Sequence, residues 1–300
     1  MMNRMFGSGG LPFVLAGLLF PAFAWAGPLN IGSISSEPVA EIRKFLPFAR
    51  YLAKELQSEE IDQGKIIVAN NIPQMANFLR EGNVDLYIDS PFPVLAASRL
   101  SGSKFLLRRW KKGSAQYHSV IFTKNDGVIS RLEDLRGKIV AFEEPFSSSG
   151  YFFPKVALMQ EGFKLVPKGN ASDPVGRDEV GYIFSLDDEN TMVWVLRGKV
   201  VAGAMDDQSY LREARRHINS LKVVYKDPPL PRHIVSYRAN LSAKLVARIK
   251  EILAKMDQSE GGKKALQDFE RTTKFDDIPE SSMASLLRAT KFIDLELGLK

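Results

Sequence analysis

The sequence predicts an α/β protein built on open, mostly parallel β-sheets flanked by helices. Short runs of β-branched and aromatic residues alternate with stretches whose apolar residues recur at helical spacing. The chain has 300 residues, 45% of them hydrophobic, which is enough for two domains of ordinary size. In such sheets ligands bind just beyond the carboxyl ends of the strands. The loops that follow strands are therefore the candidate functional segments.

The chain before residue 101 alternates strand and helix three times. We expect strands at residues 29–34, 66–69 and 84–88, and helices at residues 39–56, 72–80 and 91–100. Apolar residues occur every three or four positions in the first helix. Pro91 suits the first turn of the third helix, because a proline has no N–H to leave unpaired there.

A second α/β set follows. We expect strands at residues 119–123, 138–142, 182–185, 201–205 and 223–226, and helices at residues 153–161, 189–197 and 208–216. Residues 164–180 read as a loop-rich connection. After a proline-rich break at residues 228–231, we expect a strand at 234–238 and helices at 242–256, 261–269 and 281–287.

The N-terminal segment predicts export. Arg4 precedes an apolar run at residues 11–23 that ends in Ala24-Trp25-Ala26, the pattern of a signal peptide cleaved after residue 26. The apolar run is short for a membrane anchor, and no later segment has the ~20 apolar residues of a transmembrane helix. The chain contains no cysteine, so it can carry neither disulfides nor a lipid-modified Cys. These features predict a soluble periplasmic protein.

The charge of the mature chain argues against nucleic-acid binding. Removal of Arg4 leaves 40 of the 41 basic residues against 35 acidic ones, a formal charge of +5. The basic residues are dispersed rather than gathered into a stripe, so we expect no nucleic-acid partner.

A serine-rich turn is the most informative segment. The sequence KIVAFEEPFSSSGYFFP at residues 138–154 reads as a strand that enters a helix through Ser147, Ser148, Ser149 and Gly150. The unpaired N–H groups of the first helical turn and three hydroxyls could bind an anion. An ordinary helix cap is the alternative, since Ser is a good N-cap residue.

Two further loops hold hydroxyl or carboxyl groups at strand ends. Ser36 follows the first predicted strand, and Asp89 and Ser90 follow the third. Their positions at the carboxyl ends of strands make them candidate ligand contacts.

The chain resembles the phosphate, phosphite and phosphonate periplasmic binding proteins of ABC importers over nearly its whole mature length. The resemblance rests on five segments in order: PFARYLAKEL, VDLYIDSPFPVLAASR, LRGKIVAFEEPFSSSGYFFPKVALMQEG, ENTMVWVLRGKVVAGAMDD and VVYKDPPLPRHIVSYRANLS. The SSSG block matches the family's Ser-Thr-Ser-Gly turn, ahead of Tyr151, Pro154 and Leu158.

The resemblance implies a two-lobed binding protein with a two-crossing hinge. The expected crossings lie near residues 117–120 and 230–234. Lobe 1 then comprises residues 27–118 and 233–300, and lobe 2 residues 119–232. A small oxyanion, or a zwitterion that carries one, would bind in the cleft between the lobes, which close on it. The protein would be a monomer without cofactor that delivers its ligand to an inner-membrane ABC permease.

The resemblance also assigns candidate ligand contacts. Ser147, Ser148 and Ser149 inherit the grip on the oxyanion, and Asp206 lies at a strand end where the family often has a polar residue. Tyr151, Asp188, Ser36, Asp89 and Ser90 complete the expected set.

Two departures from the family bear on the ligand. Asp188 stands where the family usually has a His, and Pro93 stands where it often has an aromatic residue. A carboxylate facing a fully ionised phosphonate is repulsive, so Asp188 favours a protonated oxyanion or one linked to an amine. Alternatively, Asp187 and Asp188 cap the helix that begins near residue 189.

Other functions have weaker support. A periplasmic subunit that reports ligand occupancy to a membrane histidine kinase could use the same fold. His118, His217 and His233 show no metal-ligand spacing, and the serine turn lacks the Gly-x-Ser-x-Gly pattern of a serine hydrolase. We therefore expect no metal and no enzymatic activity. Trp110, Lys111 and Lys112 read as a solvated loop or a partner contact.

Overall fold

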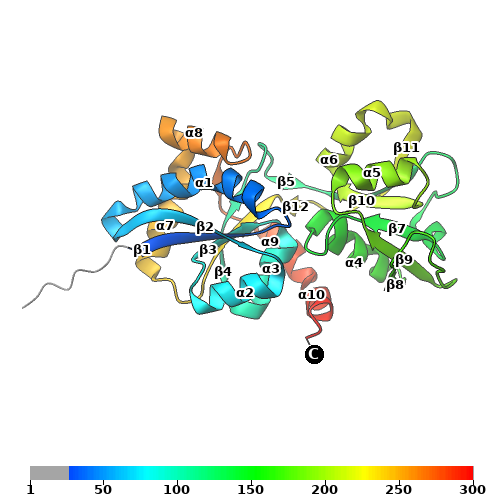
Figure 1. The fold of residues 1–300 in the computed structure, drawn as a ribbon, viewed down its shortest axis with the longest axis horizontal. Coiled ribbons are helices and arrows are strands. Elements are labelled where there is room, and N and C mark those ends of the chain that lie inside the picture. The colour runs from blue at the N-terminus through cyan, green and yellow to red at the C-terminus, as the bar shows by residue number, and fades with distance from the viewer. Residues whose placement is uncertain (1–26, 300) are drawn as a thin grey trace, which may run out of the picture.

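The computed structural model describes residues 27–299, so the predicted signal peptide lies outside the described residues. Within this range the chain forms two six-stranded sheets, each flanked by helices, and a two-stranded ribbon between them (Figure 1). The α/β class and the two-lobed architecture are confirmed. No helix of residues 27–299 combines the length and apolar character needed to cross a membrane.

The first sheet has the strand order β14-β4-β13-β3-β1-β2. Three strands are parallel: β1 (Gly27–Ile34), β2 (Ile61–Ala69) and β3 (Leu86–Asp89). The other three add antiparallel: β13 (His233–Tyr237), β4 (Lys104–Arg109) and β14 (Phe275–Asp276). Because three of its five pairings are antiparallel, this sheet is mixed rather than mostly parallel.

Five helices flank the first sheet: α1 (Pro38–Glu55), α2 (Ile72–Glu81), α3 (Pro91–Ser101), α7 (Ala243–Lys255) and α8 (Glu260–Asp268). One buried cluster joins Phe45 and Phe48 of α1 to Ile252 of α7, Leu266 of α8 and Leu86 of β3. These three helices therefore cover one face of the sheet.

The second sheet has the strand order β11-β6-β10-β7-β9-β8. Its strands are β6 (Ser119–Lys124), β7 (Ile139–Phe142), β8 (Lys164–Pro167), β9 (Glu179–Phe184), β10 (Ala202–Asp206) and β11 (Leu221–Lys226). The pairings of β7 with β9 and β10, and of β8 with β9, are parallel. Its helices are α4 (Phe153–Gln160), α5 (Asp188–Leu196) and α6 (Asp207–Glu213).

The ribbon between the sheets consists of β5 (Gln116–Tyr117) and β12 (Leu230–Pro231), which pair antiparallel. The chain passes from the first sheet to the second through β5 and returns through β12 (Figure 1). Both strands lie at or next to the residues where the crossings were expected, and we refer to this ribbon as the hinge.

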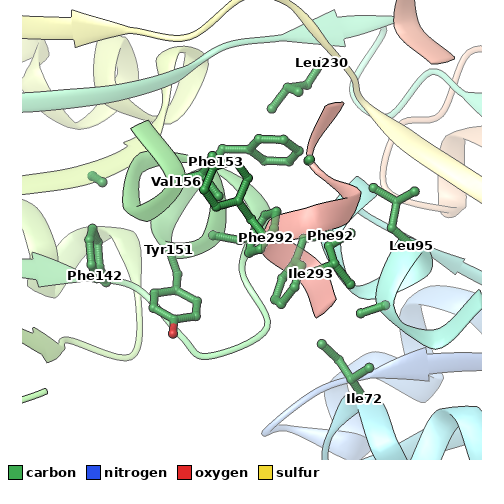
Figure 2. Close-up of a cluster of buried hydrophobic side chains, with 14 of the residues drawn as sticks. Ile72, Phe92, Leu95, Phe142, Tyr151, Phe153, Val156, Leu230, Phe292 and Ile293 are labelled. Atoms are coloured by element: carbon green, nitrogen blue, oxygen red, sulfur yellow. The ribbon is translucent and has the colours of Figure 1, made fainter. Parts of the chain in front are cut away.

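Two C-terminal helices complete the fold: α9 (Glu280–Arg288) and α10 (Thr290–Glu296). Phe292 and Ile293 of α10 belong to a buried cluster that also contains Phe92 of α3 and Phe153 and Val156 of α4 (Figure 2). The last helix therefore packs against elements that flank both sheets.

Several elements differ from the sequence-based prediction. Strand β2 begins five residues earlier than expected, β8 lies in the segment read as a loop, and β4 and α10 were not predicted. Strand β8 is short and pairs at the edge of its sheet. Strand β4 ends in Arg108 and Arg109. Arginine is usually exposed, but both side chains are buried here and form ion pairs with Asp276 and Glu270.

Candidate functional site

A cavity of about 300 Å³ lies between the two lobes, next to the hinge. Its wall from the first lobe includes Ser33 and Ser35 at the end of β1 and Asp89 at the end of β3, while the second lobe contributes the loop after β7 and Asp206 at the end of β10. Those strands all present their carboxyl ends to the cavity, as expected for ligand sites in open α/β sheets.

The cavity brings together seven of the nine residues predicted from sequence: Asp89, Ser90, Ser147, Ser148, Ser149, Asp188 and Asp206. Ser36 and Tyr151 are not among the lining residues. The Ser36 hydroxyl donates a hydrogen bond to Glu144 Oε1 at 3.0 Å, on the opposite lobe. Tyr151 packs among Phe142, Tyr182 and Phe184, and its hydroxyl donates to Glu296 of α10.

The serine-rich turn begins with Ser147, which caps a π-helical segment at Ser148–Phe152. The Ser147 hydroxyl accepts the Gly150 N–H at 3.0 Å and donates to Glu143 Oε2 at 2.6 Å. A side chain at position 150 would place its Cβ 2.5 Å from the Glu143 Cβ. Glycine is therefore required for the turn to lie so close to Glu143.

The next two serines have different surroundings. The Ser148 hydroxyl accepts the Phe92 N–H at 2.8 Å and donates to Ser90 Oγ at 2.8 Å, so it joins the two lobes. The Ser149 hydroxyl has no side-chain partner within residues 27–299, and Ser149 lines the cavity. Ser149 is thus the serine of this turn whose hydroxyl remains available to a ligand.

Carboxyl groups crowd the wall near the serine turn. Burial and the neighbouring Asp188 raise the pKa of Glu143 to about 8. Burial raises the pKa of Asp89 to about 7, and the charge of Glu41 adds to this effect while the Ser90 N–H opposes it. Both groups therefore hold a proton over part of the range near neutral pH.

The structure separates the two alternatives for Asp187 and Asp188. Asp187 is the N-cap of α5, and its side chain accepts the Asn190 N–H at 2.6 Å. Asp188 instead lines the cavity, 3.6 Å from Arg212 Nη2. Burial and Asp206 raise the pKa of Asp188. The capping function belongs to Asp187, and the Asp188 carboxyl remains directed to the cleft.

Cationic side chains line the part of the cavity near the hinge. Arg232 lies 3.6 Å from Asp206 Oδ2, and Lys111 Nζ lies 3.0 Å from Glu270 Oε1. Burial would raise the pKa of Glu270, but Lys111 and Arg109 lower it to about 2. Lys112 also lines this part of the cavity. These cations give this part of the cavity positive charge, which would attract an anion.

Sequence reasoning missed most of these hinge groups. Lys111 and Lys112 were expected in a solvated loop or a partner contact. Tyr117 and Arg232 fell in the expected crossings, and Glu143 in a candidate loop, but none of the three was assigned as a ligand contact. Arg232 lies within the crossing expected at residues 230–234, so its position at the hinge is the signal that could have identified it. Within residues 27–299, no cluster of His, Cys, Asp and Glu could hold a metal ion.

The fold and the cleft define a two-lobed binding protein. The family model for ABC transporter phosphonate periplasmic substrate-binding proteins matches residues 31–282. The chain therefore belongs to this family.

Two curated relatives agree with this assignment, and a solved structure shares the fold. The chain is 24% identical to the phosphate-import protein PhnD of Mycolicibacterium smegmatis (75% of this chain, 71% of the relative). It is 28% identical to the phosphonates-binding periplasmic protein of Escherichia coli (77% and 67%). A structure of XAC2383 from Xanthomonas citri, bound to chloride ion, has the same fold (TM-score 0.84, 23% identity, 90% of this chain and 98% of that one).

A third relative is a sensor histidine kinase. The tetrathionate sensor histidine kinase TtrS of Salmonella typhimurium is 29% identical over 147 residues, which cover 47% of this chain and 24% of that protein. The match is confined to a minor part of the kinase.

Proposed function

We propose that this protein captures a small oxyanion in the cleft between its lobes and delivers it to an ABC importer. The observation that supports the proposal best is the cavity of about 300 Å³, where cations and hydroxyl groups from both lobes converge at strand ends. Its size suits a small molecule rather than a peptide or nucleic acid. Membership in the substrate-binding family supports transport rather than catalysis.

The ligand is a phosphonate, phosphate or phosphite-like anion, or a zwitterion that contains one. Two relatives are named for phosphate import and phosphonate binding. The carboxyl groups of Asp89, Glu143 and Asp188 lower the anion affinity of their side of the cleft. They favour a ligand that carries an amine or a proton in addition to the oxyanion.

The lobes comprise residues 27–118 with 233–300, and residues 119–232. The membership of the strands in the two sheets supports this division. The protein acts as a monomer in the periplasm, where relatives of this family function, after removal of the signal peptide at residues 1–26.

Thermal shift and titration calorimetry test the proposal. The purified protein is mixed with methylphosphonate, inorganic phosphate, phosphite and 2-aminoethylphosphonate. A ligand at 100 times its dissociation constant should stabilise the folded protein by about 2.7 kcal/mol. Absence of binding to every one of these compounds would refute the proposal.

Ligand sensing for a membrane histidine kinase is the second candidate, and the partial match to TtrS favours it. Deletion of the gene distinguishes the two functions. Loss of uptake of the radiolabelled ligand supports import. Normal uptake with a lost transcriptional response to the ligand supports sensing.

A further inference from the structure

The hinge contributes two buried side chains to the cavity. Tyr117 ends β5 and is 2% exposed, while Arg232 follows β12 and is 8% exposed. The Arg232 guanidinium lies over the Tyr117 ring, 4.7 Å from its centroid. Both residues line the cavity.

Both side chains have a buried polar atom without a hydrogen-bond partner among residues 27–299: the Tyr117 hydroxyl and Arg232 Nε. The nearby Ser148 hydroxyl donates to Ser90 instead. Such unsatisfied buried groups are uncommon and cost about 1 to 3 kcal/mol each. Two of them on the wall of one cavity indicate that a ligand completes their hydrogen bonds.

Asp206 does not supply the missing hydrogen bond of Arg232. Its Oδ1 accepts the N–H groups of Gln208 and Ser209 at 3.0 Å each, and its Oδ2 accepts the Ser209 hydroxyl at 2.8 Å. The contact of Asp206 with Arg232 is long, at 3.6 Å. The Arg232 guanidinium therefore keeps hydrogen-bonding capacity toward the cavity.

Charge near the hinge is also unbalanced. Four cationic side chains meet here (Arg109, Lys111, Lys112 and Arg232), whereas Glu270 and Asp206 are the carboxylates paired with them. The four cations therefore outnumber their two ion-pair partners, and Asp89 and Glu41 interact with Lys111 and Arg109 at longer range. The wall at the serine turn instead carries three carboxyl groups, those of Glu143, Glu144 and Asp188, with Arg212 as the cation near Asp188.

Two of the three hydroxyls of the serine turn already have hydrogen-bond partners. Ser147 is bonded to Glu143 and Gly150, and Ser148 to Phe92 and Ser90. An oxyanion at this turn would meet one free hydroxyl, that of Ser149, and several carboxyl groups. The cleft is thus divided into a cationic hinge side and a carboxyl side.

We propose that Lys111, Tyr117 and Arg232, which we call the hinge floor, form the subsite that binds the oxyanion. The inference rests on the proposed function and locates the anion within the same cleft. Arg232 Nε and the Tyr117 hydroxyl donate to the anion oxygens, and Lys111 supplies charge. The other end of the ligand faces Ser149 and the carboxyl groups.

Calorimetric titration with methylphosphonate tests the hinge floor, alongside melting curves of the ligand-free proteins. Arg232→Gln should weaken binding ~10- to 100-fold, because a charged hydrogen bond is lost. Tyr117→Phe should weaken it several-fold without lowering the melting temperature, because its hydroxyl has no partner in the free protein.

Two variants outside the cavity serve as controls. The Tyr225 hydroxyl donates to Asp227 at 3.0 Å, and Arg238 pairs with Asp85 at 2.8 Å. Tyr225→Phe and Arg238→Gln should lower the melting temperature and leave the affinity unchanged. Tyr117→Phe and Tyr225→Phe should therefore show opposite patterns.

The outcomes separate the two proposals. If the wild-type protein binds methylphosphonate and both hinge variants bind it equally well, the hinge floor is refuted and the proposed function stands. If the wild-type protein binds neither methylphosphonate nor phosphate, phosphite or 2-aminoethylphosphonate, both proposals fail.

Discussion

Ser147, Ser148 and Ser149 are neighbours in the sequence, but their hydroxyls have different partners. Ser147 donates to Glu143 at the start of the helix, Ser148 donates to Ser90 of the other lobe, and Ser149 lines the cavity. The anion-cradle and helix-cap interpretations of this turn therefore apply to different residues. Ser147 is the cap, and Ser149 is the candidate ligand donor.

This division gives opposite expectations for two alanine variants. Ser149→Ala should weaken ligand binding by about 0.5 to 1.5 kcal/mol, the contribution of a hydrogen bond, with little effect on folding. Ser147→Ala should cost about 1 kcal/mol of folding stability, because Gly150 loses its cap. Calorimetry and urea denaturation measure the two quantities. Equal effects of both variants on affinity would contradict the assignment.

Asp188 offers a second test at this scale. Asp187 provides the helix cap, so Asp188→Asn should leave the stability of α5 intact. Removal of the negative charge should strengthen binding of inorganic phosphate and weaken that of 2-aminoethylphosphonate. Calorimetry with both ligands measures the change in ranking. Asp187→Asn, which can still cap, is the matched control. An unchanged ranking for Asp188→Asn would show that Asp188 does not face the ligand.

At the scale of elements, the local residue pattern predicted most helices and the apolar buried strands, but not every strand. The helix at 39–56 was recognisable because its apolar spacing is independent of the rest of the chain, and α1 occupies nearly the same residues. Strand β4 was not, because Arg109 is buried by partners such as Glu270, 161 residues away. Side chains that depend on distant ion pairs leave no local signal.

The same reason explains which site residues were predictable. Asp89 and the serine turn follow strands, so the strand-end rule found them. Lys111 and Arg232 come from different segments that meet only when the chain crosses the hinge twice. Their convergence depends on the tertiary fold, and the loop around Lys111 looks solvated when read alone.

Helix α10 links the two lobes. Asp294 accepts from Arg99 Nε at 2.7 Å on α3, while Glu296 accepts from Lys155 Nζ at 2.6 Å on α4. Phe292 is buried in the cluster of Figure 2, together with Phe92 of α3 and Phe153 of α4. Opening of the cleft should disrupt one of these two sets of contacts.

We therefore expect the double variant Arg99→Gln with Lys155→Gln to favour the open form. Small-angle scattering should show a larger radius of gyration for the ligand-free variant than for the wild type, and ligand saturation should reduce the difference. Lys264→Gln, which removes an exposed pair with Asp268 on α8, is the control. Identical radii for the double variant and the wild type would show that these contacts of α10 do not hold the lobes together.

At the scale of the whole molecule, the cleft affects the pH dependence of stability. Burial raises the pKa of Glu143 to about 8, of Asp89 to about 7 and of Asp227 to about 6. In the unfolded chain these groups ionise near pH 4. Between pH 4 and these higher values, the folded protein binds more protons than the unfolded chain. The free energy of unfolding must then fall as the pH rises.

His233 and Glu270 also have shifted pKa values, but they affect the free energy of unfolding mainly below pH 6.5. Burial and nearby cations hold the pKa of His233 well below its usual value, which makes stability rise with pH up to about 6.5. The lowered pKa of Glu270, about 2, affects stability only in acid. Glu143 and Asp89, with pKa values of about 8 and about 7, titrate in the interval from pH 6.5 to 8.

We expect the ligand-free protein to lose stability from pH 6.5 to 8, by at most about 1.4 kcal/mol per pH unit for each group. Glu143→Gln should flatten this slope, because the amide does not ionise, whereas Glu251→Gln on the exposed face of α7 should not. Urea denaturation at half-unit pH intervals measures both slopes. The same deprotonation adds negative charge to the cleft, so the affinity for methylphosphonate should fall over this interval and fall less in Glu143→Gln. Parallel slopes for the wild type and Glu143→Gln would show that Glu143 is already ionised at neutral pH.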